Sequence, residues 1–143
     1  MGGGQAEGPQ PGGGHRLTGA QYDKGCFFAP TVLTGVTNAM RVAREEIFGP
    51  VLVVIPFDSD AEAVAIANDS DYGLAGSIYS TDSQRARKLA NQVRTGILSI
   101  NDIALLSDFT PFGGYKSSGI GREFGEDGLT SYTQIKTIYT SSE

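Results

Sequence analysis

The chain has little sulfur and little positive charge. Its 143 residues include one cysteine and one histidine, which excludes an internal disulfide and a zinc site of the usual Cys/His kind. Lys and Arg number 11 against 16 Asp and Glu, giving a formal net charge of −5, and the basic residues form no stripe. This balance argues against nucleic acid or an anionic membrane surface as a partner. We expect a cytoplasmic protein.

Long hydrophobic runs are also missing. The longest strongly apolar stretch covers residues 51–55 and is followed by Pro56. A membrane span needs roughly 18 such residues, so we expect none. The hydrophobic share of 39% is still enough to build the core of one soluble domain.

Glycine is unevenly distributed. Eight of the 20 glycines lie in the first 19 residues, where little apolar surface is available to offset the entropy of ordering the chain. We therefore expect residues 1–18 to be a flexible lead-in. We expect residues 19–133 to form the folded part, and residues 134–143 a terminal strand with a short tail.

The middle of the chain has a regular pattern. Apolar segments of strand length begin at Val51, Leu74 and Ile97, spaced by 23 residues each time. A helical pattern occupies each gap. Strands that alternate with helices in this way are typical of a parallel sheet with right-handed crossovers. The sequence therefore predicts the α/β class with a parallel βαβαβ sheet.

Helix starts carry their own signals. Ser59 with Glu62, and Thr81 with Gln84, stand at the spacing of a capping box, and Gly96 is expected to end the second helix. Asn38 is the expected N-cap of an earlier short helix. Further elements are expected as a strand within residues 27–33 edged at Pro30, a helix near 123–132 and a last strand at 135–140.

The loop after the third strand is the expected functional region, because ligands of open parallel sheets bind beyond the carboxyl ends of the strands. It leads into a glycine-rich segment, residues 111–123. A phosphate loop of the Walker type needs Gly directly before Lys, whereas Tyr115 precedes Lys116 here, and the dinucleotide spacing G-x-G-x-x-G is also missing. We interpret the segment as a tight irregular loop whose glycines permit unusual dihedral angles.

Two polar features remain open at this point. Cys26 and His15 could form a nucleophile and base, but no third group orients His15, so an incidental cysteine is the preferred interpretation. Glu45 and Glu46 lie at an expected helix end, where the helix dipole disfavours carboxylates. They are either part of a solvated face or a site where one carboxylate accepts hydrogen bonds from paired ligand hydroxyls.

Two segments, residues 43–50 (AREEIFGP) and 111–119 (PFGGYKSSG), resemble carboxyl-terminal signatures of the NAD(P)-dependent aldehyde dehydrogenase superfamily. The similarity runs from about residue 19 to the end of the chain. It is supported by residues 27–33 (FFAPTVL), 68–74 (NDSDYGL), the loop at Asn101, residues 121–123 (GRE) and 132–137 (YTQIKT). The resemblance implies part of the family's catalytic domain with a carboxyl-terminal oligomerisation strand.

The resemblance also implies roles for individual residues. Glu46 is expected to bind the hydroxyls of the nicotinamide ribose and Phe48 to pack against the cofactor, NAD or NADP. The loop 102–112 is expected to line the aldehyde tunnel, with Leu106 and Phe112 as wall residues. An apolar wall would suit an uncharged aliphatic or aromatic aldehyde. The last strand is expected to join the sheet of a neighbouring subunit in a homo-oligomer.

The family's chemistry is carried by other segments. A cysteine forms a thiohemiacetal with the aldehyde, hydride passes to the nicotinamide, and a glutamate base aids hydrolysis of the acyl-enzyme. These residues and most of the cofactor domain belong upstream of everything matched here, and Cys26 falls after the nucleophile in the family's order. We therefore expect a carboxyl-terminal portion that is inactive by itself.

Two alternatives from other classes stay open. The first is a non-catalytic interaction module that retains the fold and binds a full-length dehydrogenase subunit or a metabolite. The second is a flavodoxin-like nucleotide-binding protein, for which the loops offer no supporting chemistry.

Overall fold

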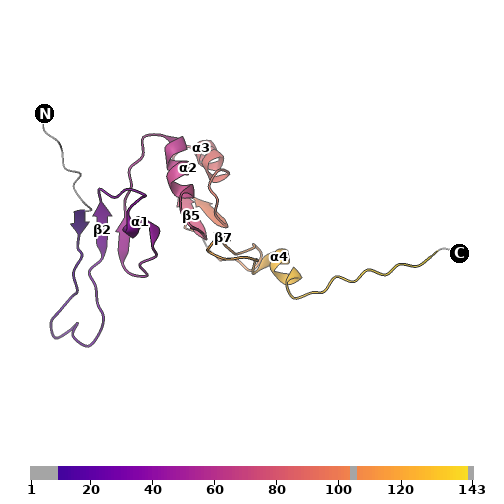
Figure 1. Ribbon diagram of the computed structural model, residues 1–143, viewed down its shortest axis with the longest axis horizontal. Coiled ribbons are helices and arrows are strands. Elements are labelled where there is room, and N and C mark those ends of the chain that lie inside the picture. Colours follow the sequence, from indigo (N-terminus) through magenta and orange to yellow (C-terminus); the bar gives the residue numbers. More distant parts are fainter. Residues whose placement is uncertain (1–9, 104–105, 142–143) are drawn as a thin grey trace. The chain divides into compact units, whose positions relative to one another are not determined.

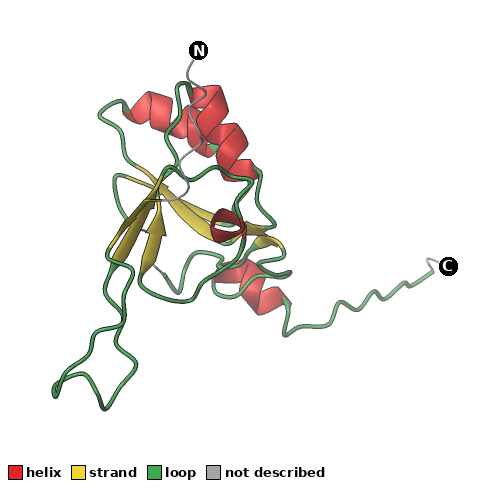
Figure 2. Ribbon diagram, turned by 60° about the vertical axis from the view of Figure 1, so that its left-hand side comes forward, coloured by secondary structure: helices red, strands yellow, loops and turns green. Residues whose placement is uncertain are grey.

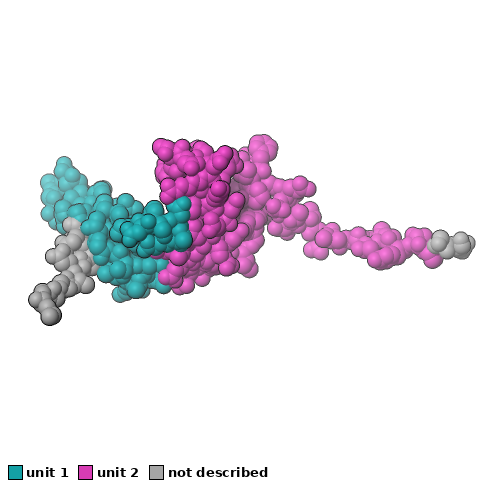
Figure 3. All heavy atoms as spheres, turned by 90° about the horizontal axis from the view of Figure 1, so that it is seen from above, with its two compact units in different colours: residues 1–63 teal, residues 64–143 magenta. Residues whose placement is uncertain are grey.

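The computed structural model describes residues 10–103 and 106–141. The chain divides into two compact units, residues 1–63 and 64–143 (Figure 3). The chain contains both helices and strands (Figure 2). The mixed α/β class predicted from the sequence is therefore confirmed.

The first unit is built on a three-stranded sheet of order β1-β2-β3 (Figure 1). Its strands are β1 (Gln10–Gly12), β2 (Thr31–Thr34) and β3 (Val51–Val53). β1 runs antiparallel to β2, and β3 runs parallel to it. The strand expected beside Pro30 is confirmed, because β2 begins directly after this proline, which has no N–H for a ladder.

A long hairpin connects β1 to β2. The main chain of Leu17 donates to the Phe27 carbonyl at 3.0 Å, and that of Ala29 donates to the His15 carbonyl at 2.9 Å. The rings of Tyr22 and Phe27 meet edge to face, with centroids 5.6 Å apart. We expected a flexible lead-in over residues 1–18; residues 10–18 are instead held by β1 and this hairpin, and residues 1–9 lie outside the described residues.

The helix expected from Asn38 is shorter than the sequence indicates. Helix α1 (Arg41–Arg44) has Met40 at its N-cap, and no side chain caps it there. The prediction of Asn38 as N-cap is therefore wrong by two positions. Glu45 is the C-cap, and the segment from Glu45 to Pro50 is not helical.

The second unit contains a βαβ motif. Strands β5 (Ala75–Ile78) and β6 (Ile97–Ile100) pair in parallel and are connected through helix α3 (Ser83–Ala90). Parallel neighbours need such a crossover because a tight turn cannot join them. This half of the predicted βαβαβ pattern is confirmed.

The single parallel sheet predicted for all three strands is wrong. Among the described residues, β3 pairs with β2, while β5 and β6 form a separate two-stranded sheet. A third ladder joins β4 (Tyr72–Gly73) to β7 (Tyr115–Lys116) in antiparallel fashion. The apolar pattern of residues 51–55 indicates a strand but does not specify its neighbour.

The two capping signals have different outcomes. At α2 (Asp60–Asn68), the Glu62 main chain donates to Ser59 Oγ at 3.2 Å, and the Glu62 carboxylate accepts from the Asp58 main chain at 2.7 Å. At α3 the N-cap is Asp82, whose carboxylate accepts from two helix amides at 3.0 Å each, so Thr81 is not the cap. Carboxylates cap helices at least as well as hydroxyls, and Asp82 stands one residue nearer.

Gly96 has a different role from the one expected. Helix α3 already ends at Ala90, with Asn91 as its C-cap. A Cβ on residue 96 would overlap the Gly113 carbonyl oxygen, so glycine allows two main-chain segments to approach closely there.

Large side chains contribute little to the buried core. The buried hydrophobic residues among those described are Ala29, Val36 and Ala86. Helix α4 (Gly125–Thr130) lies within the helical region expected at 123–132. The segment expected as the last strand, residues 135–140, is exposed and forms no ladder with the described chain.

Candidate functional site

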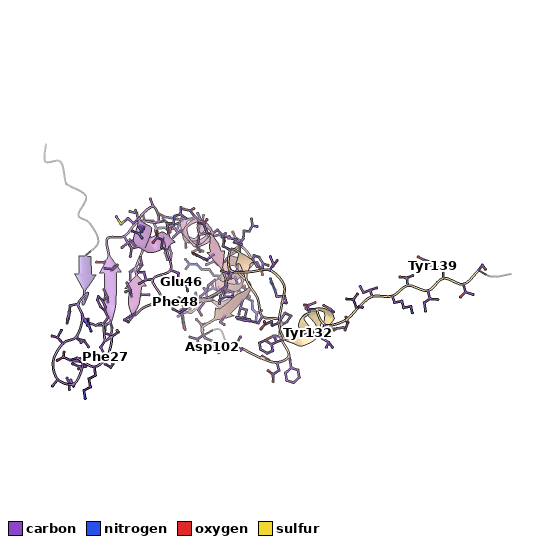
Figure 4. The ribbon with its side chains drawn as sticks, turned by 60° about the horizontal axis from the view of Figure 1, so that its bottom comes forward. Phe27, Glu46, Phe48, Asp102, Tyr132 and Tyr139 are labelled. Carbon is purple, nitrogen blue, oxygen red and sulfur yellow. The ribbon has the colours of Figure 1, made fainter. Side chains whose placement is uncertain are left out.

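The segment between α1 and β3 carries the expected cofactor residues, Glu46 and Phe48 (Figure 4). Its paired glutamates differ in their surroundings. Arg41 Nε donates to Glu45 Oε1 at 2.7 Å, and this hydrogen bond and charge hold the pKa of the Glu45 carboxyl below its usual range and raise the pKa of Arg41. Among the described residues, no side chain or main-chain amide engages the Glu46 carboxylate, which is exposed.

Phe48 has an unusual main-chain conformation. Its φ angle is 56°, in the left-handed region that a bulky residue rarely adopts. Its side chain is 92% exposed, although an aromatic ring normally gains free energy by burial. An outlier of this kind is typical of functional segments and motivates a functional hypothesis for Phe48.

The expected wall residues lie in the second unit, on the loop that follows β6. Leu106 is 65% exposed, and Phe112 is partly buried. The main chains of Phe112 and Glu123 exchange two hydrogen bonds of 2.7 and 2.8 Å. These hydrogen bonds hold the carboxyl end of the loop against Glu123.

A cavity of about 360 Å³ opens next to the paired residues Phe112 and Glu123. Phe112 is one of its lining residues, together with Leu74, Arg122, Glu123 and Tyr132, and glycines supply much of the remainder. Leu106 is not part of this lining. The two expected wall residues thus share the loop but not the cavity.

The glycine-rich segment is irregular, as the sequence predicts. Gly119 and Gly121 have φ angles of 133° and 84°. Arg122 Nη1 donates to the carbonyls of Gly114 and Gly121, at 3.1 and 2.6 Å, and the guanidinium carbon lies 5.6 Å from the centre of the Tyr115 ring. Arg122 is therefore engaged in holding the loop.

The remaining candidates, Cys26 and His15, lie in the β1–β2 hairpin. Cys26 is exposed in the β1–β2 hairpin, and the His15 carbonyl in the same hairpin is used for main-chain pairing. The described residues contain no group of three or more His, Cys, Asp or Glu side chains able to hold a metal ion. No helix within the described ranges is long and apolar enough to cross a membrane.

Asn101, the first residue after β6, is named in the sequence prediction only for the loop that supports the resemblance, without a role of its own. Its φ angle is 56°, and its side chain makes two hydrogen bonds to the main chain of Ser80. An asparagine directly after an apolar strand is the sequence signal that could have identified this role, because asparagine tolerates this conformation.

Comparison with known proteins defines the class. The sequence profile of the aldehyde dehydrogenase family matches residues 4–138. The chain belongs to the aldehyde dehydrogenase family, a family of enzymes.

Individual relatives support this assignment. A betaine aldehyde dehydrogenase of Brucella melitensis biotype 2 is 48% identical over 128 residues, which cover 90% of this chain and 26% of that protein. The crystal structure of a betaine aldehyde dehydrogenase from Staphylococcus aureus in complex with NAD+ superimposes with a TM-score of 0.85 at 44% identity, covering 89% of this chain and 25% of that one. For an aldehyde dehydrogenase from Mycobacterium tuberculosis complexed with NAD+, the values are 0.83 and 45%, with 94% and 28% covered. The chain thus spans about a quarter of the length of these relatives.

Proposed function

We propose that this chain is the carboxyl-terminal portion of an NAD-dependent aldehyde dehydrogenase, which oxidises an aldehyde to a carboxylic acid through a cysteine thiohemiacetal. The family match over residues 4–138 carries the proposal, and relatives solved with NAD+ favour this cofactor over NADP. The nucleophilic cysteine, its glutamate base and most of the cofactor domain are supplied by other parts of the subunit.

Glu46 is proposed to bind the nicotinamide ribose. A carboxylate accepts hydrogen bonds from two adjacent hydroxyls, and Glu46 has both oxygens available among the described residues, whereas Glu45 is committed to Arg41. The exposed ring of Phe48 offers a flat apolar surface two residues further along. These two residues therefore fit the cofactor, which when bound supplies the hydride acceptor.

Leu106 and Phe112 are proposed to line the approach of the aldehyde. Both are apolar, and Phe112 also lines the cavity of the second unit. An apolar lining stabilises an uncharged aliphatic or aromatic substrate by removing its surface from water. The terminal segment 135–140 is proposed to extend the sheet of a neighbouring subunit, forming a homo-oligomer.

A hybrid subunit tests the proposal. In this hybrid, the present chain replaces the matching quarter of the Staphylococcus aureus betaine aldehyde dehydrogenase, which keeps its own nucleophile and cofactor domain. We expect NADH formation with uncharged aldehydes, followed by its absorbance. A folded, oligomeric hybrid that oxidises no aldehyde would contradict the proposal and favour the non-catalytic interaction module.

A further inference from the structure

Strand β6 ends in an unusual way. Asn101 follows Ile100, the last residue of the strand, and its φ angle of 56° takes the main chain out of the extended conformation. The Asn101 amide nevertheless donates to the Ile78 carbonyl at 2.8 Å. The chain thus leaves the sheet at residue 101 while its amide still belongs to the β5–β6 ladder.

The side chain of Asn101 makes the hydrogen bonds that the main chain would make at the next position of that ladder. In a parallel pair, a residue that donates to one carbonyl of the neighbouring strand also accepts, through its own carbonyl, from the amide two residues further along. Here that amide belongs to Ser80, and it donates to Asn101 Oδ1 at 2.8 Å. Asn101 Nδ2 in turn donates to the Ser80 carbonyl at 2.9 Å. The side-chain amide thus continues the pairing after the main chain has turned away.

The other end of the loop is held differently. Two main-chain hydrogen bonds join Phe112 and Glu123, and the Gly125 amide donates to the Asp108 carbonyl at 3.0 Å. These contacts do not depend on the identity of any side chain. At the start of the loop, by contrast, both hydrogen bonds to Ser80 come from a single side chain, that of Asn101.

We propose that Asn101 is a positioning residue for the aldehyde: its side-chain amide pins the start of the loop to Ser80 and so sets where Leu106 stands. The part that concerns the aldehyde rests on the proposed function. The pinning itself rests on the hydrogen bonds of Asn101. Two hydrogen bonds from one planar group also fix the direction in which the chain leaves the strand.

Three variants separate these contributions. Asn101→Gly keeps the left-handed conformation without strain but removes both hydrogen bonds. Asn101→Asp keeps an acceptor for the Ser80 amide and loses the donor to the Ser80 carbonyl. Ser80→Ala is the matched control, because the Ser80 hydroxyl accepts a hydrogen bond from the Asp82 amide and none from Asn101, and the alanine retains the main-chain N–H and carbonyl.

The first measurement is amide hydrogen exchange by NMR on the 143-residue chain, which needs no activity. We expect the residue 80 amide to exchange at least about tenfold faster in Asn101→Gly, with shifted resonances for residues 106–109. Protection should persist in Asn101→Asp at neutral pH and in Ser80→Ala. Unchanged exchange and unchanged loop resonances in Asn101→Gly would overturn the proposal.

The second measurement uses the hybrid subunit and distinguishes positioning from general stability. We expect Asn101→Gly to raise KM for an uncharged aldehyde by about tenfold, with a smaller change in kcat and none in KM for NAD+. Ser80→Ala should leave all three unchanged. Equal KM values for the parent and Asn101→Gly would overturn the positioning role. A parent hybrid without any turnover would instead contradict the proposed function, and the exchange measurement would still decide the role of Asn101.

Discussion

Lys116 Nζ donates a hydrogen bond of 2.8 Å to the carbonyl oxygen of Asn68, 48 residues earlier in the chain. A second hydrogen bond of 2.9 Å reaches the Ser70 carbonyl. Lysine in a glycine-rich segment invites comparison with phosphate loops, in which the ammonium group faces the ligand. Here the ammonium group fastens the glycine-rich segment to the end of α2, in agreement with the irregular loop expected from the sequence.

The paired glutamates should respond differently to substitution. In the hybrid subunit, Glu46→Gln is expected to slow hydride transfer by about tenfold to a hundredfold, because a charge-assisted hydrogen bond to the ribose is weakened. Single-turnover NADH formation measures this step. Glu45→Gln is the matched control and should be much milder, since Glu45 is paired with Arg41. Equal effects from both substitutions would contradict the assignment.

The isolated 143-residue chain should oxidise no aldehyde. Positioning of a thiolate, an oxyanion donor and a hydride acceptor supplies much of the rate of such chemistry, and Cys26 lies exposed in a hairpin. We expect no NADH or NADPH from the purified chain with a panel of aldehydes, and weak cofactor binding at best. Turnover above a blank that disappears in Cys26→Ser would overturn this prediction.

The terminal segment should control assembly. Ile135 and Tyr139 are 99% and 92% exposed, and an extended apolar segment of this kind is a template for pairing with another chain. In the hybrid, deletion of residues 134–143 is expected to reduce the oligomer to a smaller species by light scattering. Deletion of residues 141–143 alone should leave it intact. An unchanged oligomer after the longer deletion would show that the segment is dispensable for assembly.

Gly96 should be intolerant of any side chain. Gly96→Ala places a methyl group against the Gly113 carbonyl and is expected to lower the free energy of unfolding by about 1–3 kcal/mol. Urea denaturation of the 143-residue chain measures the change. Gly76→Ala, within β5, is the control, because no atom lies within 4 Å of the added carbon. A similar loss of stability in both variants would show that close approach is not the cause.

The Arg41–Glu45 pair should be visible in a titration. Because the folded pKa of the Glu45 carboxyl is lowered, the pair stabilises the fold above the pKa of the unfolded chain, and this contribution is lost as the pH falls through the folded value. Arg41→Gln is expected to return the pKa of Glu45 toward its usual range in an NMR titration. Lys24→Gln, in the β1–β2 hairpin, is the charge-matched control and should leave it lowered.

Short-range sequence patterns were sufficient to predict individual helices and strands. The β5–α3–β6 motif follows from apolar segments of strand length and a capped helix between them, all encoded within a few residues. The connection between β2 and β3 contains a four-residue helix without a side-chain cap, so it lacks the signals that mark a crossover between paired strands. Strands β4 and β7 have two residues each, so neither is long enough to show the alternation of apolar and polar residues that predicts a strand.

In the candidate site, too, the sequence predicted some residues but not the contacts that they make. Glu46 and Phe48 are predicted as cofactor residues from the resemblance, and Glu46 also from the pair of carboxylates at an expected helix end. The sequence alone could not assign Arg41 to Glu45, because both neighbouring glutamates are within reach of basic residues on one helical turn. Nor could it show that the Asn101 side chain replaces a main-chain acceptor, since this depends on the φ angle at the end of β6.

The small set of buried hydrophobic side chains has a calorimetric consequence. Ala29, Val36 and Ala86 are small, and large apolar side chains such as Phe48, Phe109 and Ile120 are 90% or more exposed before any unfolding occurs. The heat-capacity increment of unfolding scales with the apolar surface newly exposed to water, and so does the dependence of stability on denaturant concentration. The isolated chain should therefore melt over a broad temperature range, with a shallow stability curve. Association with the remainder of a dehydrogenase subunit should bury these side chains. Unfolding would then expose more apolar surface, and the melting transition should become sharper.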